Sequence, residues 1–179
     1  MSELEISEKE NTLKKWQDKV DITYEDYFQA PYYIPHKGVV ELARELEGFM
    51  GKEKALEAVG KAFERLAIDQ AKKQVEEKPI NNFEEYKNAF KESMRQPLAS
   101  HTTNLTIVEE TSKKLSAKIT ECLFAKSFKK MNATDLGYIM VCKPDFATTK
   151  ISNPKLNLTR TKTLMQGDEC CNHTYTWEE

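Results

Sequence analysis

Long apolar runs are missing from this 179-residue sequence, and none approaches the ~20 residues that a membrane-spanning helix needs. The first residues, MSELEISEKENTLKK, also lack the basic start and the apolar stretch of a secretory signal. We therefore expect a cytoplasmic protein without a membrane partner. In that reducing compartment the cysteines are expected to be thiols rather than bridges; they are Cys122, Cys142, Cys170 and Cys171.

A surplus of either charge is also absent, because 27 Lys and Arg residues balance 29 Asp and Glu residues to a net charge of −2. Such a chain offers no electrostatic reason to expect nucleic acid as a partner. The length and the 39% of hydrophobic residues suffice for one core, so a single domain over residues 1–179 is expected. The sequence leaves the oligomeric state open, a homo-oligomer included.

The spacing typical of a zinc site is missing as well. No C-x-x-C occurs, and the neighbours Cys170 and Cys171 would face opposite ways on a strand. We therefore expect neither a metal nor another cofactor. A soft-metal site that gathers Cys122, Cys142, Cys171 and His173 in space stays open as an alternative.

Residues 1–96 are predicted to be mainly helical. Between residues 51 and 77 the apolar positions recur at steps of three and four, which predicts one buried stripe on a long helix: Ala55, Val59, Ala62, Phe63, Leu66, Ala71 and Val75. Pro79 follows as a stop, and Asn82 with Glu85 has the spacing of a capping box for the next helix. The Tyr- and Pro-rich stretch before them either covers a pocket or packs on the core, with a short helix from about Lys37.

Residues 97–179 change to a period of two. Segments 104–110 and 114–122 alternate, with Leu115 and Ala117 on one face and Ser116 on the other, as in antiparallel strands. A helical piece after Cys122, a second near 134–150 and a final pair of strands follow. In that pair a turn is expected at Gln166–Glu169, and one face of the last strand carries Cys171, His173, Tyr175 and Trp177.

Helices first and strands later predict an α+β domain. In it the helical N-terminal half packs on a C-terminal antiparallel sheet with one or two inserted helices. The α+β part, residues 97–179, carries the motifs that follow.

Three constellations in this part could carry chemistry. Cys142 and Asp145 stand at i and i+3, so that on a helix a thiol and a carboxylate project from one face. Arg160, next to Thr161 on a strand, has the planar fork that clamps a carboxylate, or else forms an ordinary cross-strand ion pair. The third is the stretch GDECCNH, in which a hairpin would present Asp168 and one cysteine to a pocket.

Taken together, these pieces resemble the L-2-amino-thiazoline-4-carboxylic acid hydrolase family. The resemblance rests on Cys122 leading into a helix, then on LGYIMVCKPD, then on LTRTKTLMQGDECCNHTY, and covers about residues 98–177. The N-terminal half matches only in being helical. His173 stands where an aromatic residue is usual and Cys170 is an additional thiol, so a changed substrate is one reading of these differences.

The resemblance implies the ring opening of a cyclic isothiourea, the 2-aminothiazoline, to a carbamoyl-cysteine. By position, Cys142 or Cys171 would be the nucleophile or a substrate contact, and Asp145 and Asp168 would carry protons. For the substrate side, Arg160 would clamp its carboxylate; Thr161, Cys122 and His173 are the other expected contacts. Two carboxylates that activate water directly, with the thiols shaping the pocket, remain an alternative.

Two readings of the function therefore stay open. The first is a hydrolase that acts on the C–N or C–S bond of a small amidine-like ring, with a small molecule as its substrate. The second is a non-catalytic module that binds or senses a small molecule or a soft metal. His36 and His101 are further potential bases, but their sequence surroundings favour structural or surface roles.

Overall fold

The computed structural model describes residues 34–178, and the described residues from His36 onward group as one compact unit. The Tyr- and Pro-rich stretch 24–33 lies outside the described residues, as does Glu179. In chain order the described part begins with four helices: α3 (Ile34–Met50), α4 (Lys52–Glu77), α5 (Phe83–Arg95) and α6 (Pro97–Thr102). None of the described helices combines the length and the apolar character needed to cross a membrane.

A β-hairpin and a run of short helices come next, and the last two strands end the described chain. The elements are β1 (Thr103–Glu110), β2 (Lys114–Cys122), α7 (Leu123–Lys130), α8 (Thr134–Gly137), the π-helix η2 (Tyr138–Cys142), α9 (Pro144–Ser152), β3 (Leu156–Arg160), the 3-10 helix η3 (Leu164–Gln166) and β4 (Cys171–Trp177). The order of helices first and strands later confirms the predicted α+β class.

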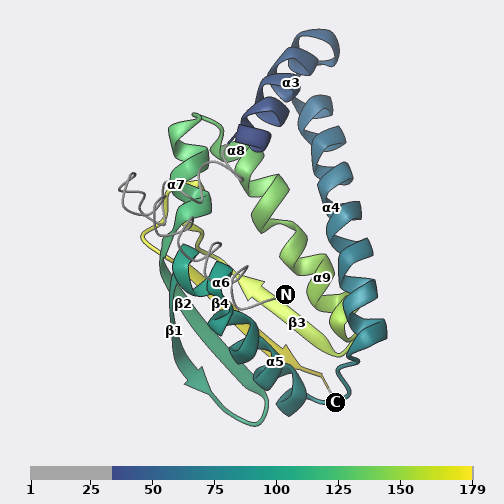
Figure 1. The fold of residues 1–179 in the computed structure, drawn as a ribbon, viewed down its shortest axis with the longest axis vertical. Helices are drawn as coiled ribbons and strands as arrows, with labels where there is room; N and C mark the ends of the chain where they lie inside the picture. Colours follow the sequence, from purple (N-terminus) through teal and green to yellow (C-terminus); the bar gives the residue numbers. More distant parts are fainter. Residues whose placement is uncertain (1–33, 179) are drawn as a thin grey trace, which may run out of the picture. The chain divides into compact units, whose positions relative to one another are not determined.

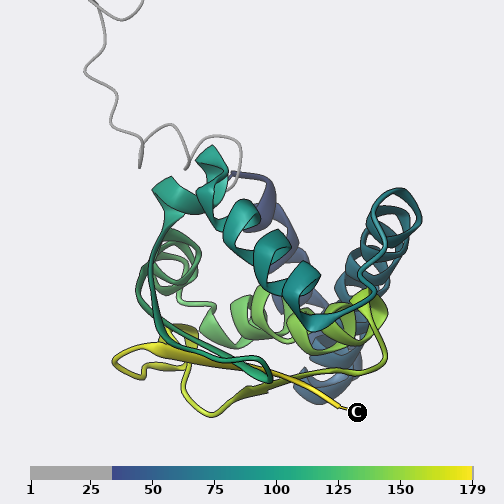
Figure 2. The same ribbon diagram turned by 90° about the horizontal axis from the view of Figure 1, so that it is seen from below.

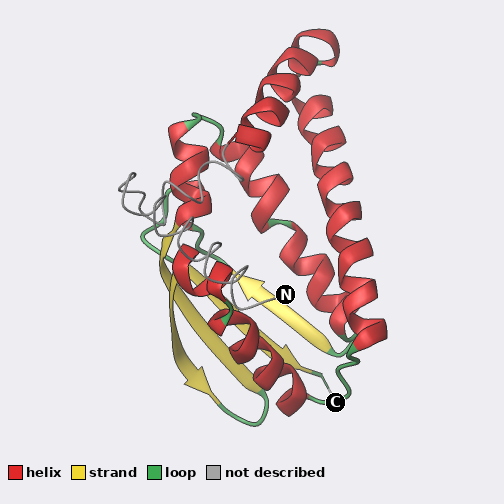
Figure 3. Cartoon of the chain, viewed as in Figure 1, coloured by secondary structure: helices red, strands yellow, loops and turns green. Residues whose placement is uncertain are grey.

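The four strands form one antiparallel sheet in the order β1-β2-β4-β3. Leu115 of β2 pairs with Tyr175 of β4, which in turn pairs with Leu158 of β3, so that these residues line up across the sheet. Figure 1 shows the helices over the sheet, and Figure 2, turned by 90°, shows that they cover one face of it. The colouring in Figure 3 separates the helical layer from the strands.

The core lies between the sheet and α5. Phe83, Leu115, Leu156 and Tyr175 are buried together, and Tyr86 and Phe90 of α5 pack against them. The start of α5 follows from its cap, because the Asn82 side chain accepts a hydrogen bond from the Glu85 backbone N–H at 2.9 Å. The aromatic stripe predicted for this segment is thus the face that covers the sheet.

Several details differ from the sequence prediction. Leu66, assigned to the buried stripe of α4, has 62% of its surface exposed, although Ala55 and Ala71 on either side of it are buried. Ser116, on the face of β2 opposite Leu115 and Ala117, is also buried and shares a hydrogen bond with Thr174. The predicted four-residue turn after β3 is a longer connection, residues 161–170, that contains η3. The short helix α6 was not predicted.

Candidate active site

The guanidinium of Arg160, at the end of β3, is the centre of a buried polar cluster. Its side chain is 2% exposed. It donates hydrogen bonds to the Asp145 carboxylate at 2.7 Å, to the Cys142 carbonyl oxygen at 2.8 Å and to Nε2 of His173 at 3.1 Å. Asp145 keeps 43% of its side-chain surface exposed. The cluster therefore has a buried cation as its floor and an accessible carboxylate at its edge.

The Cys142 carbonyl is free to bind Arg160 because Phe146 N–H, which would donate to it in a regular α-helix, donates to Lys143 O instead. Pro144 has no N–H to donate, and it breaks the regular pattern of helix hydrogen bonds. Before it, Lys143 N–H donates to Tyr138 O at 2.8 Å, the five-residue step of a π-helix; after it, Phe146 N–H turns to Lys143 O. Arg160 thus links the last residue of η2 to the first turn of α9 across the break.

His173 lies directly opposite Arg160 on the neighbouring strand β4. Since an arginine can only donate, Nε2 of His173 accepts and the ring hydrogen belongs on Nδ1. Nε2 is 3.9 Å from the Asp145 carboxylate, and the ring stacks on Tyr175 with an interplanar angle of 7°. The side chain of His173 therefore stacks as an aromatic ring would at this position, and it adds an imidazole group to the cluster.

Aromatic rings complete the walls around the guanidinium. The ring centres of Tyr138 and Phe146 lie 5.9 Å and 5.0 Å from it, within the range of cation–π attraction. Burial disfavours the charge of Arg160, but Asp145 and Cys142 outweigh it and hold the pKa of the guanidinium above its ordinary value. The cation is therefore permanent.

Three thiols from three elements gather near this cation: Cys122 at the end of β2, Cys142 in η2 and Cys171 at the start of β4. Burial is the largest influence on each and raises its pKa, for Cys142 to about 12, while Arg160 partly offsets it for Cys142 and Cys171. Cys171 acts electrostatically on both Cys122 and Cys142, and Cys122 acts on Cys142. At neutral pH they are thiols in the unliganded protein.

Backbone N–H groups lie close to two of these sulfurs. Leu164 N–H donates to Sγ of Cys171 at 3.3 Å. Cys122 occupies the cap position of α7, where the N–H groups of Phe124 and Ala125 lower its pKa and so oppose the effect of burial. Both sulfurs therefore have local donors that would favour a thiolate once it formed.

Asp168 and Thr161 do not join the cluster by any described contact. The carboxylate of Asp168 accepts the Thr163 backbone N–H at 2.6 Å, next to Gly167, whose φ of 102° is a conformation that glycine adopts readily. Thr161 is exposed, and its hydroxyl accepts a hydrogen bond from the Asn172 amide. In the described structure both residues shape the connection between β3 and β4.

The remaining candidates have structural surroundings. Cys170 and Cys171 are both buried. Neighbours within a strand would point to opposite faces, but Cys170 precedes β4 and lies outside the strand. His36 contacts the rings of Phe63 and Phe128, and His101 is exposed on α6. Across residues 34–178 no group of three or more His, Cys, Asp or Glu side chains is arranged to hold a metal ion.

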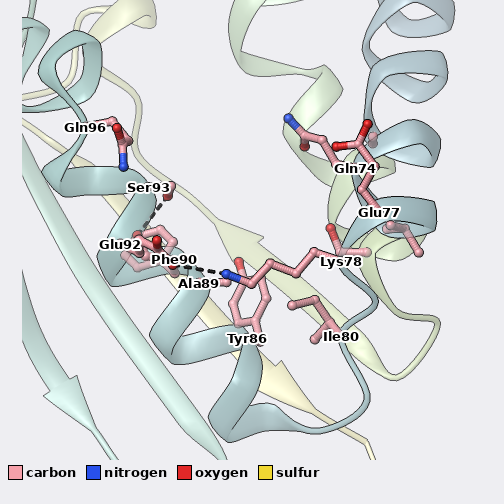
Figure 4. A pocket seen from close by; sticks show the side chains of 13 residues that line it. Gln74, Glu77, Lys78, Ile80, Tyr86, Ala89, Phe90, Glu92, Ser93 and Gln96 are labelled. Atoms are coloured by element: carbon pink, nitrogen blue, oxygen red, sulfur yellow. Dashed lines mark hydrogen bonds and ion pairs between the residues drawn. The ribbon is translucent and has the colours of Figure 1, made fainter.

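A groove of about 480 Å³ lies between the end of α4, one side of α5 and the last residue of α9. Figure 4 shows its lining, with Tyr86 and Phe90 on the α5 side and Lys78 extending across from the end of α4. The Tyr86 hydroxyl donates to the hydroxyl of the buried Tyr175. Since Tyr175 stacks on His173, these two rings join the groove to the cluster.

Comparison with known families agrees with these motifs. The family model for L-2-amino-thiazoline-4-carboxylic acid hydrolase matches residues 32–175. The chain belongs to this family. The match starts before α3, so membership in the L-2-amino-thiazoline-4-carboxylic acid hydrolase family includes the helical half, for which the sequence suggested a likeness in helix content alone.

Comparisons with individual proteins add less. No curated protein matches this member of the family. Among solved structures, a trafficking protein particle complex subunit 3 from Naegleria fowleri, covalently bound to palmitic acid, is similar at a TM-score of 0.45 and 11% identity. The similarity covers 82% of this chain and 96% of that one.

The two stretches that carry the family motifs do meet in space. Cys142 and Asp145 come from the first, Cys171 and His173 from the second, and Arg160 connects them. Sequence reasoning missed Tyr86 and Tyr138. Tyr86 has the spacing of an ordinary core residue, and only its hydroxyl group distinguishes it from the phenylalanines of the same stripe.

Proposed function

We propose that this chain is a hydrolase that opens a small cyclic amidine or isothiourea ring, with a 2-aminothiazoline carboxylate as the type of substrate. Membership in the family supports the hydrolase class. The observation that carries the proposal is the accessible Asp145 carboxylate, fixed by the buried Arg160 beside the Cys142 thiol. The catalytic residues we propose are Cys142, Asp145 and Cys171.

Asp145 suits the chemistry of such a ring. The ring carbon bonded to two nitrogens and a sulfur becomes electrophilic when the amidine is protonated, and that cation would pair with an exposed carboxylate. Arg160 holds the carboxylate from its buried side. Asp145 would accept a proton from the attacking nucleophile and return it to the ring atom that leaves.

Two nucleophiles are consistent with this arrangement. In the first route the thiol of Cys142 adds to the ring carbon as its proton passes to Asp145, the ring bond breaks, and water then releases the carbamoyl product from the sulfur. In the second, Asp145 activates water, which adds to the ring carbon directly. Both routes consume one water; the first regenerates the thiol, and the second leaves it unchanged. The neutral state of the thiols supports activation after the substrate binds, rather than a preformed thiolate.

A substrate carboxylate could bind Arg160 only if the present hydrogen bonds of its guanidinium change. Both terminal nitrogens of Arg160 already donate to protein acceptors. For Arg160 to clamp the substrate, the carboxylate would have to exchange with Asp145, which would free Asp145 for catalysis. Cys122 and His173 remain proposed contacts of the substrate. The contacts of Asp168 and Thr161 favour an indirect role, in which they hold the loop that contains Leu164 against Cys171.

The test is hydrolysis of 2-aminothiazoline-4-carboxylate by the purified full-length chain, followed as carbamoyl-cysteine by mass spectrometry. Asp145→Asn should lower kcat by about a hundredfold or more, the usual contribution of a general acid or base. Cys142→Ser separates the two routes, because it abolishes turnover in the first and leaves most of it in the second. Cys170→Ser is the matched control, since it also replaces a buried thiol but lies outside the proposed machinery.

Two outcomes would overturn the proposal. Turnover that survives Asp145→Asn unchanged removes Asp145 from the chemistry. Absence of turnover with any aminothiazoline, in a protein that such compounds stabilise thermally, supports instead the second candidate, a small-molecule binding or sensing module. The three neighbouring thiols are the observation that keeps this candidate, because they give the cluster a soft, neutral wall suited to a sulfur-containing ligand.

A further inference from the structure

The groove between α4 and α5 has a lining that suits a small planar cation. Its charged residues are Glu77, Lys78 and Glu92, so two carboxylates face one ammonium. Its apolar part includes the rings of Tyr86 and Phe90, which lie 6.3 Å apart at an angle of 33°. Aromatic faces beside an excess of negative charge attract cations that have an apolar ring.

Lys78 occupies the place that such a cation would take. Its ammonium crosses the groove and pairs with Glu92 at 3.2 Å, as Figure 4 shows. The two side chains are 72% and 63% exposed. An ion pair this exposed stabilises a fold by roughly 0–1 kcal/mol. A ligand cation can therefore displace Lys78 from Glu92 at little cost.

The groove also leads toward the proposed reaction centre. Ser152, which lines the groove, stands seven positions after Asp145, so the two lie on one face of α9, about 10 Å apart along its axis. Tyr86 connects the same two places through Tyr175 and His173. Asp145 moreover acts electrostatically on the hydroxyls of both tyrosines.

We propose that this groove binds planar amidinium cations, the substrate of the proposed hydrolase among them. Phe90 and Tyr86 would stack against the ring, and Glu92 would balance its charge after Lys78 swings away. The inference rests on the proposed function for the identity of the ligand. The groove itself is separate from Cys142, Asp145 and Arg160, so its binding can be measured without turnover.

The experiment is titration calorimetry of the full chain with 2-amino-2-thiazoline, which is an amidinium at neutral pH, in the inactive Asp145→Asn background. Glu92→Gln should weaken binding about threefold to fivefold through the lost charge. Phe90→Leu should weaken it about fivefold through the lost ring. Lys78→Gln should strengthen it about twofold to threefold, because the cation no longer competes with the ammonium. A neutral analogue, 2-methyl-2-thiazoline at about pH 8, should respond to neither charge variant.

Lys61→Gln is the matched control, since Lys61 forms an exposed pair with Glu57 on the same helix outside the groove. Equal affinity in wild type, Glu92→Gln and Phe90→Leu overturns the groove proposal, even if the wild type hydrolyses aminothiazolines. So does an affinity that Lys61→Gln changes as much as Lys78→Gln. Binding that follows the groove variants in a protein without any turnover supports the groove as a cation site and overturns the hydrolase alone.

Discussion

Arg160 and Asp145 form an ion pair of very unequal exposure: at 2.7 Å, the guanidinium is 2% exposed and the carboxylate 43%. A buried cation that loses its counter-charge is costly, whereas an exposed carboxylate that loses its partner is hydrated by water. The stability of the fold therefore depends on Asp145, and so does the proposed chemistry. Measurements of stability and of turnover on the same Asp145 variants separate the two effects.

Asp145→Ala should destabilise the fold by about 3 kcal/mol, because it leaves Arg160 buried without a counter-charge. Asp145→Asn keeps an oxygen acceptor and should cost less, about 1–2 kcal/mol. Urea unfolding followed by circular dichroism measures both. Asp69→Ala, an exposed aspartate on α4, is the control and should stay within about 0.5 kcal/mol of wild type. Equal stabilities of Asp145→Ala and wild type would show that Arg160 does not need this carboxylate.

Cys142 should resist alkylation in the native protein. With its pKa raised to about 12 by burial, its thiolate fraction near pH 7 is on the order of a thousandfold below that of an ordinary cysteine. Iodoacetamide labelling read at each cysteine by mass spectrometry should therefore find Cys142 slow in the folded chain and ordinary in guanidinium chloride. Labelling of Cys142 as fast as free cysteine at neutral pH would contradict the buried, neutral thiol and favour a preformed nucleophile.

Local signals in the sequence were reliable where one interaction decides the structure. Asn82 begins α5 because its side chain caps the helix, and the alternation of β4 places Cys171, His173 and Tyr175 on the buried face. Gly167, within the predicted turn at Gln166–Glu169, has a positive φ of 102°, although the whole connection is longer than that turn. Each of these features depends on residues a few positions apart, which a single sequence contains in full.

The arrangement of the site depended on contacts that a single sequence does not contain. Arg160 could equally have been a substrate clamp or a cross-strand partner, and the Cys142 carbonyl becomes its acceptor because Phe146 N–H donates to Lys143 O. Asp168 had the chemistry of a catalytic acid, but its carboxylate holds the Thr163 backbone. Leu66 matched the helical period, yet the period does not tell which of its positions another element covers.

The stability of the fold should fall in alkaline solution. Burial raises the pKa of Cys142 to about 12 and also raises those of Tyr86 and Tyr175 above the ordinary tyrosine value. Below the unfolded thiol value, about pH 8.5, both states hold the Cys142 proton and its contribution is complete. As pH rises further the unfolded chain loses this proton first, so the free energy of unfolding declines by up to about 1.4 kcal/mol per pH unit for the thiol.

Urea midpoints in a reducing buffer at about pH 8 and about pH 10.5 measure this decline. Cys142→Ala should be less stable than wild type at the lower pH and should lose less on going to the higher one, because it has no thiol to ionise. The tyrosines keep part of the decline in that variant. Identical losses in the two proteins would show that the Cys142 thiol ionises at an ordinary pH in the folded state.

Gly137, the second residue of the LGYIMVCKPD stretch, should not tolerate a side chain. A Cβ at this position would lie 2.5 Å from Cγ of Phe128 and 2.6 Å from Sδ of Met165. Phe128 and Met165 are fully buried, so neither ring nor thioether has free space to move into. Gly137→Ala should therefore destabilise the fold by about 1–3 kcal/mol through overpacking, and it should shift η2 with Cys142.

Gly48→Ala is the matched control. Gly48 is also helical, but a Cβ there would meet no atom within 4 Å, so alanine should stabilise α3 by about 0.5–1 kcal/mol. Denaturant unfolding gives both values, and labelling of Cys142 reports whether η2 has moved, since a displaced thiol reacts faster. If Gly137→Ala were as stable as Gly48→Ala, the close approach of α8 to α7 and η3 would not be a constraint on the site.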